Sequence, residues 1–172
     1  DMPLRTSTLR SLGAYTNILA IESIMDELAT SSNTDPLEFR LRHLDDDRAK
    51  AVITAAANHA RWRQKPRRTG FGQGLAFARY NNLKAYAAVV VELEVDDLAQ
   101  IKLASAVIAV DAGQIVDPDG VRLQIEGGFL QSASWTLYEE VEFNEQGITS
   151  RDWDSYPILR FDNIPEIDIV LI

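Results

Sequence analysis

The chain has 172 residues, 46% of them hydrophobic and 25% charged, and a formal net charge of −9 at pH 7. This composition is typical of a folded chain that forms one domain or two small ones. The negative charge argues against nucleic acid or an anionic membrane surface as a partner. The chain has no cysteine, so it has no thiolates with which to hold an iron–sulfur cluster. No apolar run approaches the roughly 20 residues that a transmembrane helix needs, and the localisation stays open.

The first 69 residues are expected to be a helical segment. A first helix should begin near residue 11 and end in the polar run 30–34, with an apolar stripe formed by Tyr15, Ile18, Leu19, Met25 and Leu28. Asp35 and Pro36 are a typical helix start, because the aspartate can accept orphan amide hydrogens and proline loses nothing at the first position. A third helix is predicted over residues 46–62.

The pattern changes at Gly70, and residues 70–172 are expected to form a β-meander with one crossover helix. Three segments rich in β-branched and aromatic residues predict antiparallel strands at 75–80, 85–95 and 101–110. A short strand at 141–143, a long loop and a last strand at 167–172 follow the helix. The predicted fold class is therefore α+β: an N-terminal helical segment, then an antiparallel or mixed sheet. Both segments are expected to belong to one domain of a longer chain.

The crossover helix is the most informative stretch. Asp117 and Pro118 predict its start, and one face should then carry Gln124, Gly128, Gln131 and Trp135. Two primary amides separated by a glycine suit a flat polar ligand that donates and accepts hydrogen bonds. The glycines at 127 and 128 would let a ligand or a neighbouring backbone approach closely. The alternative is that they only let the helix pack tightly on the sheet.

Other polar patterns indicate little chemistry. The glycine-rich stretch 70–74 lacks the strand before it and the helix after it that a nucleotide loop requires, so it predicts the start of a strand. His43 and His59 have no partner at ligand spacing, which predicts no metal site. Glu139, Glu140 and Glu142 are expected to be solvated. Asp152 and Asp154, on either side of a tryptophan, could be catalytic, but their spacing alone does not indicate it.

Several stretches in unbroken order resemble one family. They are LRTSTLRSLGAYTNILAIESIMDELA at 4–29, DPLEFRLRHL at 35–44, GLAFARYNNLKAYAAVVVELEV at 74–95, and residues 110–140 and 147–172. These stretches look like the large, molybdopterin-binding subunit of the xanthine dehydrogenase/aldehyde oxidase family, in its isoquinoline 1-oxidoreductase-like or bacterial aldehyde dehydrogenase branch. The combination of DAGQ at 111–114, DPDG at 117–120 and QIEGG at 124–128 is more specific than any single glycine motif.

The resemblance implies a set of site residues. Gln124 matches a glutamine that contacts the pterin cofactor, and Gly127 lies in the same motif. Thr8, Leu9 and Arg10 match a loop against the molybdenum centre. Leu12 matches a substrate-pocket position that is aromatic in the xanthine dehydrogenase branch. Because that aromatic ring is absent here, the resemblance favours an aldehyde or a different heteroarene over a purine.

The implied function is part of the catalytic subunit of a molybdenum hydroxylase or dehydrogenase that uses water as its oxygen source. The family's glutamate base is expected downstream of residue 172, so no catalytic residue is predicted within this chain, which looks like a fragment that is inactive alone. Iron–sulfur clusters are expected on a small partner subunit. The alternative is a non-catalytic binding or assembly module of the same fold that holds no cofactor; an independent nucleotide-binding domain has little support.

Overall fold

The computed structural model describes residues 7, 9–64, 68–81 and 84–172. Its helical part consists of α1 (Ala14–Ser31), α2 (Pro36–Arg42) and α3 (Asp47–His59). The predicted cap at Asp35 is confirmed, because its carboxylate accepts a hydrogen bond from the Leu37 amide at 2.8 Å. Asp46 caps α3 in the same way, which was not predicted from the sequence. Each cap satisfies amide groups that have no partner within the helix.

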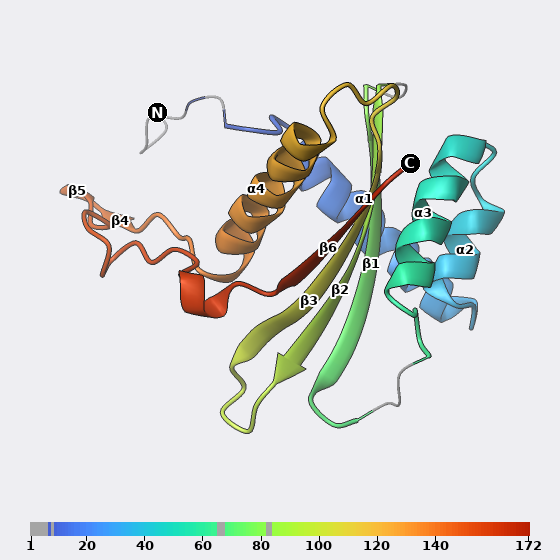
Figure 1. Cartoon of the computed structure of the whole chain (residues 1–172). Coiled ribbons are helices and arrows are strands. Elements are labelled where there is room, and N and C mark those ends of the chain that lie inside the picture. The colour runs from blue at the N-terminus through green and yellow to red at the C-terminus, as the bar shows by residue number, and fades with distance from the viewer. Residues whose placement is uncertain (1–6, 8, 65–67, 82–83) are drawn as a thin grey trace.

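The sheet contains β1 (Phe71–Tyr80), β2 (Ala85–Val95), β3 (Ile101–Asp111) and β6 (Glu166–Leu171), in the order β1-β2-β3-β6. The first three strands form the predicted antiparallel meander, whereas β6 pairs with β3 in parallel. Helix α4 (Pro118–Leu137) makes the crossover between them. In Figure 1, α4 lies on one side of the sheet and α2 and α3 lie on the other. The predicted α+β class with a mixed sheet is confirmed.

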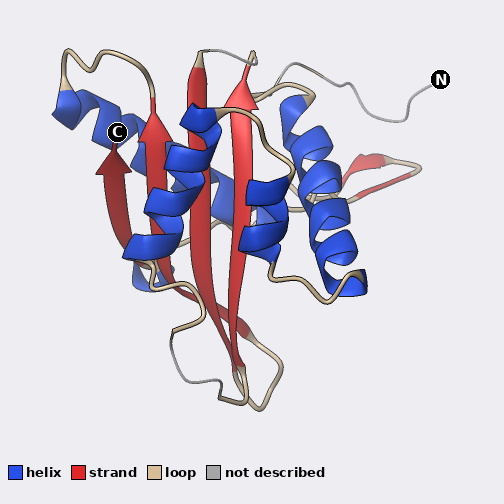
Figure 2. Cartoon of the chain, turned by 90° about the vertical axis from the view of Figure 1, so that its right-hand side faces the viewer, coloured by secondary structure: helices blue, strands red, loops and turns tan. Residues whose placement is uncertain are grey.

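The core lies between α3 and the central strands. Val52, Ile53 and Ala56 of α3 are fully buried, and they pack with Val90 of β2 and Ala109 of β3 in one apolar cluster. Figure 2 shows the helices of this face lying over the strands and running roughly along them. The helices and the sheet share this cluster, so residue 69/70 marks a change of element type. That both segments belong to one domain of a longer chain stays a prediction.

A buried charge cluster joins α1 and α2 to the free edge of β1. Arg40 is only 1% exposed and contacts Glu22 at 2.9 Å and Asp26 at 2.7 Å. The same Glu22 carboxylate accepts a hydrogen bond from the Phe77 amide of β1 at 2.8 Å. Burial raises the pKa of Glu22, although the Arg40 guanidinium opposes the shift. The cluster covers an edge strand that would otherwise present unpaired amides.

Some boundaries differ from the prediction. Strand β1 begins at Phe71 rather than residue 75, because Gly72 and Gly74 pair in register with β2. Helix α3 ends before Trp62, whose indole N–H instead donates to the Asp35 carboxylate at 3.1 Å. The predicted strand 141–143 is replaced by a hairpin of β4 (Phe143–Asn144) and β5 (Gly147–Ile148), and the long loop contains a short 3-10 helix, η1 (Phe161–Asn163). Across the described ranges, none of the helices combines the length and hydropathy that a membrane span requires.

Candidate functional site

Helix α4 and the loop before it form the framework of the candidate site. The Asp117 side chain accepts a hydrogen bond from the Gly120 amide at 3.0 Å, which confirms the predicted helix start. The helix then runs for 20 residues without a break. Its length carries Gln124 and Gln131, two turns apart, along one side.

The segment before α1 lies against this side of α4. Arg10 donates a hydrogen bond through Nη1 to the Oε1 atom of Gln131 at 3.1 Å, across 121 residues of sequence. Further along, the rings of Tyr15 and Trp135 meet edge to face with centroids 5.6 Å apart. The sequence indicated Arg10 and the amide-bearing face separately, and the structure brings them together.

The two glycines of α4 do not pack on the sheet. A Cβ atom added at Gly128 would lie 3.4 Å from Nη2 of Arg10. One added at Gly127 would meet no described atom within 4 Å. The close approach that Gly128 permits is therefore made by an arginine side chain, and Gly127 leaves an open stretch of helix surface, so the sheet-packing alternative is wrong.

The other predicted site residues near Arg10 are open to solvent. Leu9 and Leu12 are 69% and 63% exposed, and Thr8 lies outside the described residues. Ser11 and Leu12 both adopt positive φ, at 73° and 52°, which is an uncommon backbone conformation for residues other than glycine. This turn precedes α1 directly and lets Arg10 reach α4.

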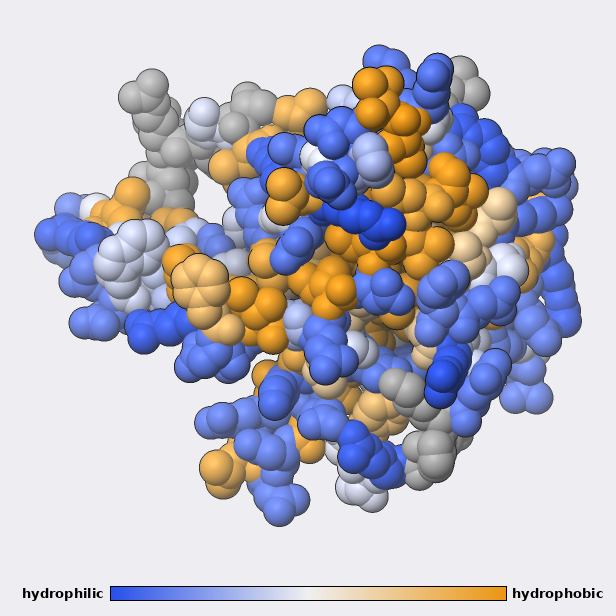
Figure 3. Space-filling model, in the orientation of Figure 1, coloured by the Kyte–Doolittle hydropathy of each residue, from blue (hydrophilic) through white to orange (hydrophobic). Residues whose placement is uncertain are grey.

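Gln124 lines a hollow of about 650 Å³ between the start of α4 and the β3–α4 loop. Gln114 contributes a second amide, and most of the remaining lining is apolar: Val110, Ile115, Val116, Val121 and Ile125. Figure 3 shows apolar side chains gathered on this face of the molecule. Val116 in this lining is 89% exposed. An apolar wall with a few amides is typical of a ligand surface.

An ion pair that the sequence did not indicate lies at the base of this loop. Asp111, the last residue of β3, accepts two hydrogen bonds from Arg48 of α3, at 2.7 Å from Nε and 2.8 Å from Nη2. The guanidinium also lies 4.3 Å from the ring centre of Tyr86. The Arg48 contact lowers the pKa of Asp111 from its ordinary value of 3.8. Because 63 residues separate the two partners, local sequence patterns carried no signal of this pair.

This pKa shift predicts how the pair responds to pH. A carboxyl group whose pKa is lower in the folded state stabilises the fold above its unfolded pKa, and it loses that contribution as the pH falls through the folded value. Wild-type protein should therefore be more stable than Asp111→Asn at neutral pH, by about 1 kcal/mol or less for such a partly exposed pair. The difference in unfolding free energy should shrink below about pH 4. Denaturant titrations of both full-length proteins at several pH values measure it, and a difference that grows on acidification would contradict the assignment.

Glu139 is a second correction, because it is not solvated as predicted. Its carboxylate accepts hydrogen bonds from the Ser134 hydroxyl at 2.5 Å and the Tyr156 hydroxyl at 2.8 Å. The contact with Glu139 raises the pKa of Tyr156. The cluster ties the long loop to the end of α4.

Of the two aspartates with undecided roles, Asp152 bonds to Ser155 within its own turn.

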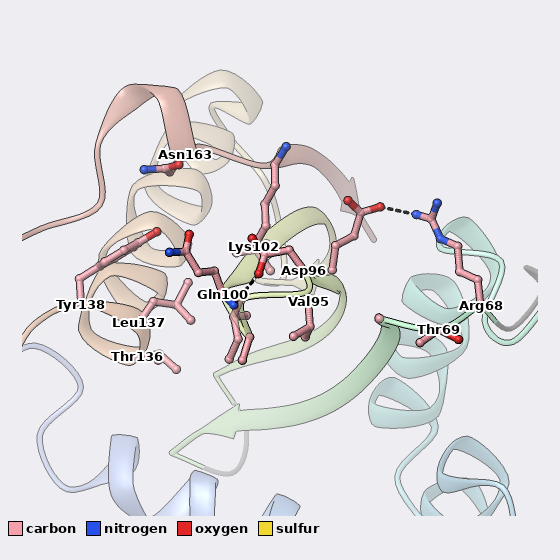
Figure 4. Close-up of a pocket in the computed structure, with 15 residues that line it drawn as sticks. Arg68, Thr69, Val95, Asp96, Gln100, Lys102, Thr136, Leu137, Tyr138 and Asn163 are labelled. Atoms are coloured by element: carbon pink, nitrogen blue, oxygen red, sulfur yellow. Dashed lines mark hydrogen bonds and ion pairs between the residues drawn. The ribbon is translucent and has the colours of Figure 1, made fainter.

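A larger hollow, of about 930 Å³, lies at the opposite end of α4 (Figure 4). It is bordered by the β2–β3 hairpin, the residues before β1, and Tyr138 and Asn163. Arg68 pairs with Glu94 there, and Asp96 accepts hydrogen bonds from the amides of its own turn. None of the sequence-predicted site residues lines it, so its size alone does not make it the candidate site.

Comparison with known proteins identifies the family of this chain. The family model described as "Molybdopterin cofactor-binding domain" matches residues 12–165. One subunit of the nicotinate dehydrogenase of Pseudomonas putida is 39% identical over 98% of this chain and 16% of its own length. The beta subunit of the isoquinoline 1-oxidoreductase of Brevundimonas diminuta is 33% identical over 95% of this chain and 21% of its own length. Among solved structures, quinoline 2-oxidoreductase from Pseudomonas putida 86 aligns with a TM-score of 0.49 and 24% identity, over 51% of this chain and 12% of that one.

The chain thus spans only 16% and 21% of the length of these two relatives. The family match covers α1, α2, α3 and α4 and the first three strands of the sheet. The relatives match nearly the whole chain and not a local motif. The chain belongs to the molybdopterin cofactor-binding domain family.

Proposed function

We propose that this chain is part of the catalytic subunit of a molybdenum hydroxylase or dehydrogenase that oxidises an aldehyde or an N-heteroarene with water as the oxygen source. The observation that carries the proposal is the meeting of Arg10 with the amide-bearing side of α4, where its guanidinium contacts Gln131 at 3.1 Å. Two relatives that match nearly the whole chain are named for oxidation of N-heteroarenes, which favours that substrate class.

The residues on this side fit a molybdopterin cofactor. A pterin ring offers hydrogen-bond donors and acceptors along its edges, and the side-chain amides of Gln124 and Gln131 provide both complements. Arg10 supplies a fixed positive charge suited to the anionic parts of the cofactor. A Cβ at Gly128 would already reach within 3.4 Å of the Arg10 guanidinium, so the glycine keeps this approach open. We assign Gln124, Arg10, Leu9, Thr8 and Gly127 to cofactor binding.

The bound cofactor would supply the two-electron redox chemistry, and this chain's residues would bind and orient it. Gln124 on α4 and Arg10 on the segment before α1 would hold the cofactor from two parts of the chain, which would set its orientation as well as its affinity. Leu12, on the turn beside Arg10, presents an apolar side chain to the substrate pocket. Its 63% exposure in this chain leaves room for a flat or aliphatic group.

We further propose a small iron–sulfur subunit as partner and electron acceptor. Its support is indirect: the two relatives are named as subunits, and the present chain has no cysteine to hold a cluster. The second candidate function is a cofactor-free assembly module of the same fold. The positive charge and the amides beside Gly128 favour the first candidate, because an assembly surface has no need to hold a guanidinium against a glycine.

Turnover by the full-length protein with its partners tests the proposal. Purified complex should oxidise nicotinate, isoquinoline or an aldehyde with an artificial electron acceptor, and isotopically labelled water should place its oxygen in the product. The family resemblance predicts no catalytic base within these 172 residues. General-base catalysis alone contributes about 10²–10⁴-fold, so this chain by itself should show no turnover. A complex that carries molybdenum but takes its product oxygen from O₂ would contradict the proposed reaction.

A further inference from the structure

Asp111 makes two kinds of contact at once at the end of β3. Both carboxylate oxygens face the Arg48 fork, at 2.7 Å and 2.8 Å. The Oδ1 atom also accepts a hydrogen bond from the Gly113 amide at 2.9 Å. Gly113 has φ of 75°, so the chain reverses here in a conformation that favours glycine. The Asp111 side chain therefore both ties the turn to Arg48 and holds the backbone of the turn through Gly113.

The anchor itself is held from several elements. In the sheet register, Arg79 of β1, Tyr86 of β2 and Asp111 of β3 stand side by side. Tyr86 is 2% exposed, and the Arg48 guanidinium packs over the face of its ring. Asp46 caps α3 and accepts a hydrogen bond from Arg79 at 3.1 Å. The position of the Arg48 guanidinium is thus restricted by contacts outside the turn, chiefly with the Tyr86 ring.

The turn leads directly into the wall of the hollow beside Gln124. Ala112, Gln114, Ile115, Val116 and Asp117 all line it. The far end of this loop is fixed separately, because Asp117 caps α4 through Gly120. The loop is short, and both of its ends are held, by Asp111 and by Asp117. Its position therefore depends on both carboxylates. The side chain of Asp117 holds the helix end, and that of Asp111 holds the sheet end.

We propose that the Arg48–Asp111 ion pair is a positioning device that fixes the β3–α4 turn and thereby the cofactor-facing wall that contains Gln114 and Gln124. This inference rests on the proposed function for its cofactor, but not for the turn geometry. Arg48 and Asp111 act through the loop and are positioning residues. Neither is proposed to contact the cofactor directly.

The chain offers a matched control. Asp35 also accepts a backbone amide, from Leu37 at 2.8 Å, and an arginine, Arg63 at 3.1 Å. Its side chain is 25% exposed, against 14% for Asp111. It lies at the start of α2, and it does not line the hollow beside Gln124. Asp35→Asn therefore also removes chiefly an ion pair beside an amide cap, and it does not touch the β3–α4 turn; it differs in that the Trp62 indole also donates to Asp35.

The experiment compares Asp111→Asn, Arg48→Gln, the double variant and Asp35→Asn in the full-length protein purified with its partners. Asparagine can still accept the Gly113 amide, so Asp111→Asn removes chiefly the ion pair. We expect amide hydrogen exchange of residues 112–117 to become about tenfold faster, and molybdenum retention during dialysis to fall by a similar factor. The double variant should be no worse than Arg48→Gln alone, because the ion pair is one shared contact and Arg48→Gln already removes the guanidinium from Tyr86. Asp35→Asn should lower the melting temperature and change neither readout.

The outcomes separate the two proposals. Unchanged exchange at residues 112–117 in Asp111→Asn would overturn the positioning role, whatever the molybdenum content. Equal loss of molybdenum in Asp111→Asn and Asp35→Asn would also overturn it, because the loss would then follow general stability. If wild-type protein holds no molybdenum, the proposed function fails, and faster exchange of the turn would still support the positioning of this loop.

Discussion

Replacing Arg40 by alanine is expected to destabilise the fold by about 3–5 kcal/mol, because removing one partner of a buried ion pair leaves the other uncompensated. Arg40 is 1% exposed, and the Glu22 side chain beside it is only 12% exposed. The variant would leave this carboxylate between α1 and β1, where the Phe77 amide is its partner from the sheet. Denaturant unfolding of the full-length protein at pH 7 measures the loss.

The controls for this prediction come from the same helix. Arg42 pairs with Glu38 on the surface, where both side chains are 63% exposed, so Arg42→Ala should cost about 0.5 kcal/mol or less. Burial already raises the pKa of Glu22. Protonation of Glu22 removes the uncompensated charge, so the destabilisation caused by Arg40→Ala should shrink at acidic pH. A loss below about 1 kcal/mol at pH 7 would show that the cluster contributes little.

Gln124→Ala is expected to lower cofactor affinity by one to two decades while the apo-protein keeps its stability. An unpaired polar group in a dehydrated site costs roughly 1–3 kcal/mol, which corresponds to about ten- to a hundredfold in affinity. Gln124 is exposed on α4, and alanine is well accepted within a helix. Molybdenum content should therefore fall, and the melting temperature of the apo-protein should stay nearly unchanged.

Glu126→Ala provides the control for this variant, because Glu126 is exposed on the same helix but lies two residues further, on a different side. It should leave both molybdenum content and melting temperature unchanged. If Gln124→Ala left molybdenum untouched and lowered the melting temperature of the apo-protein, Gln124 would be a packing residue. The cofactor role of this side of α4 would then be wrong.

Local patterns were sufficient for most of the fold. The caps at Asp35 and Asp117 and the strand periodicity depend on neighbouring residues, so the sequence predicted these elements within a few positions. The errors occurred where a distant partner decides the outcome. Glu139 was predicted to be solvated, but the Tyr156 hydroxyl, 17 residues away, donates to it. Strand β1 extends through Gly72 and Gly74 because these residues pair with β2.

In the site too, the sequence predicted features that depend on neighbouring residues and missed those that depend on distant partners. The amides on one side of α4 could be read from helical spacing alone. The contact between Arg10 and Gln131, and the ion pair between Arg48 and Asp111, depend on tertiary packing across 121 and 63 residues. No local pattern in one sequence carries such a pairing, so the sequence indicated the parts of the site and not their arrangement.

The most direct test of the account is the molybdenum and pterin content of the wild-type full-length protein, purified with its partners from cells that make the cofactor. The account predicts close to one molybdenum and one pterin per polypeptide, both reduced by Gln124→Ala. A folded protein that contains neither, while a known molybdenum enzyme in the same cells is fully loaded, would contradict it.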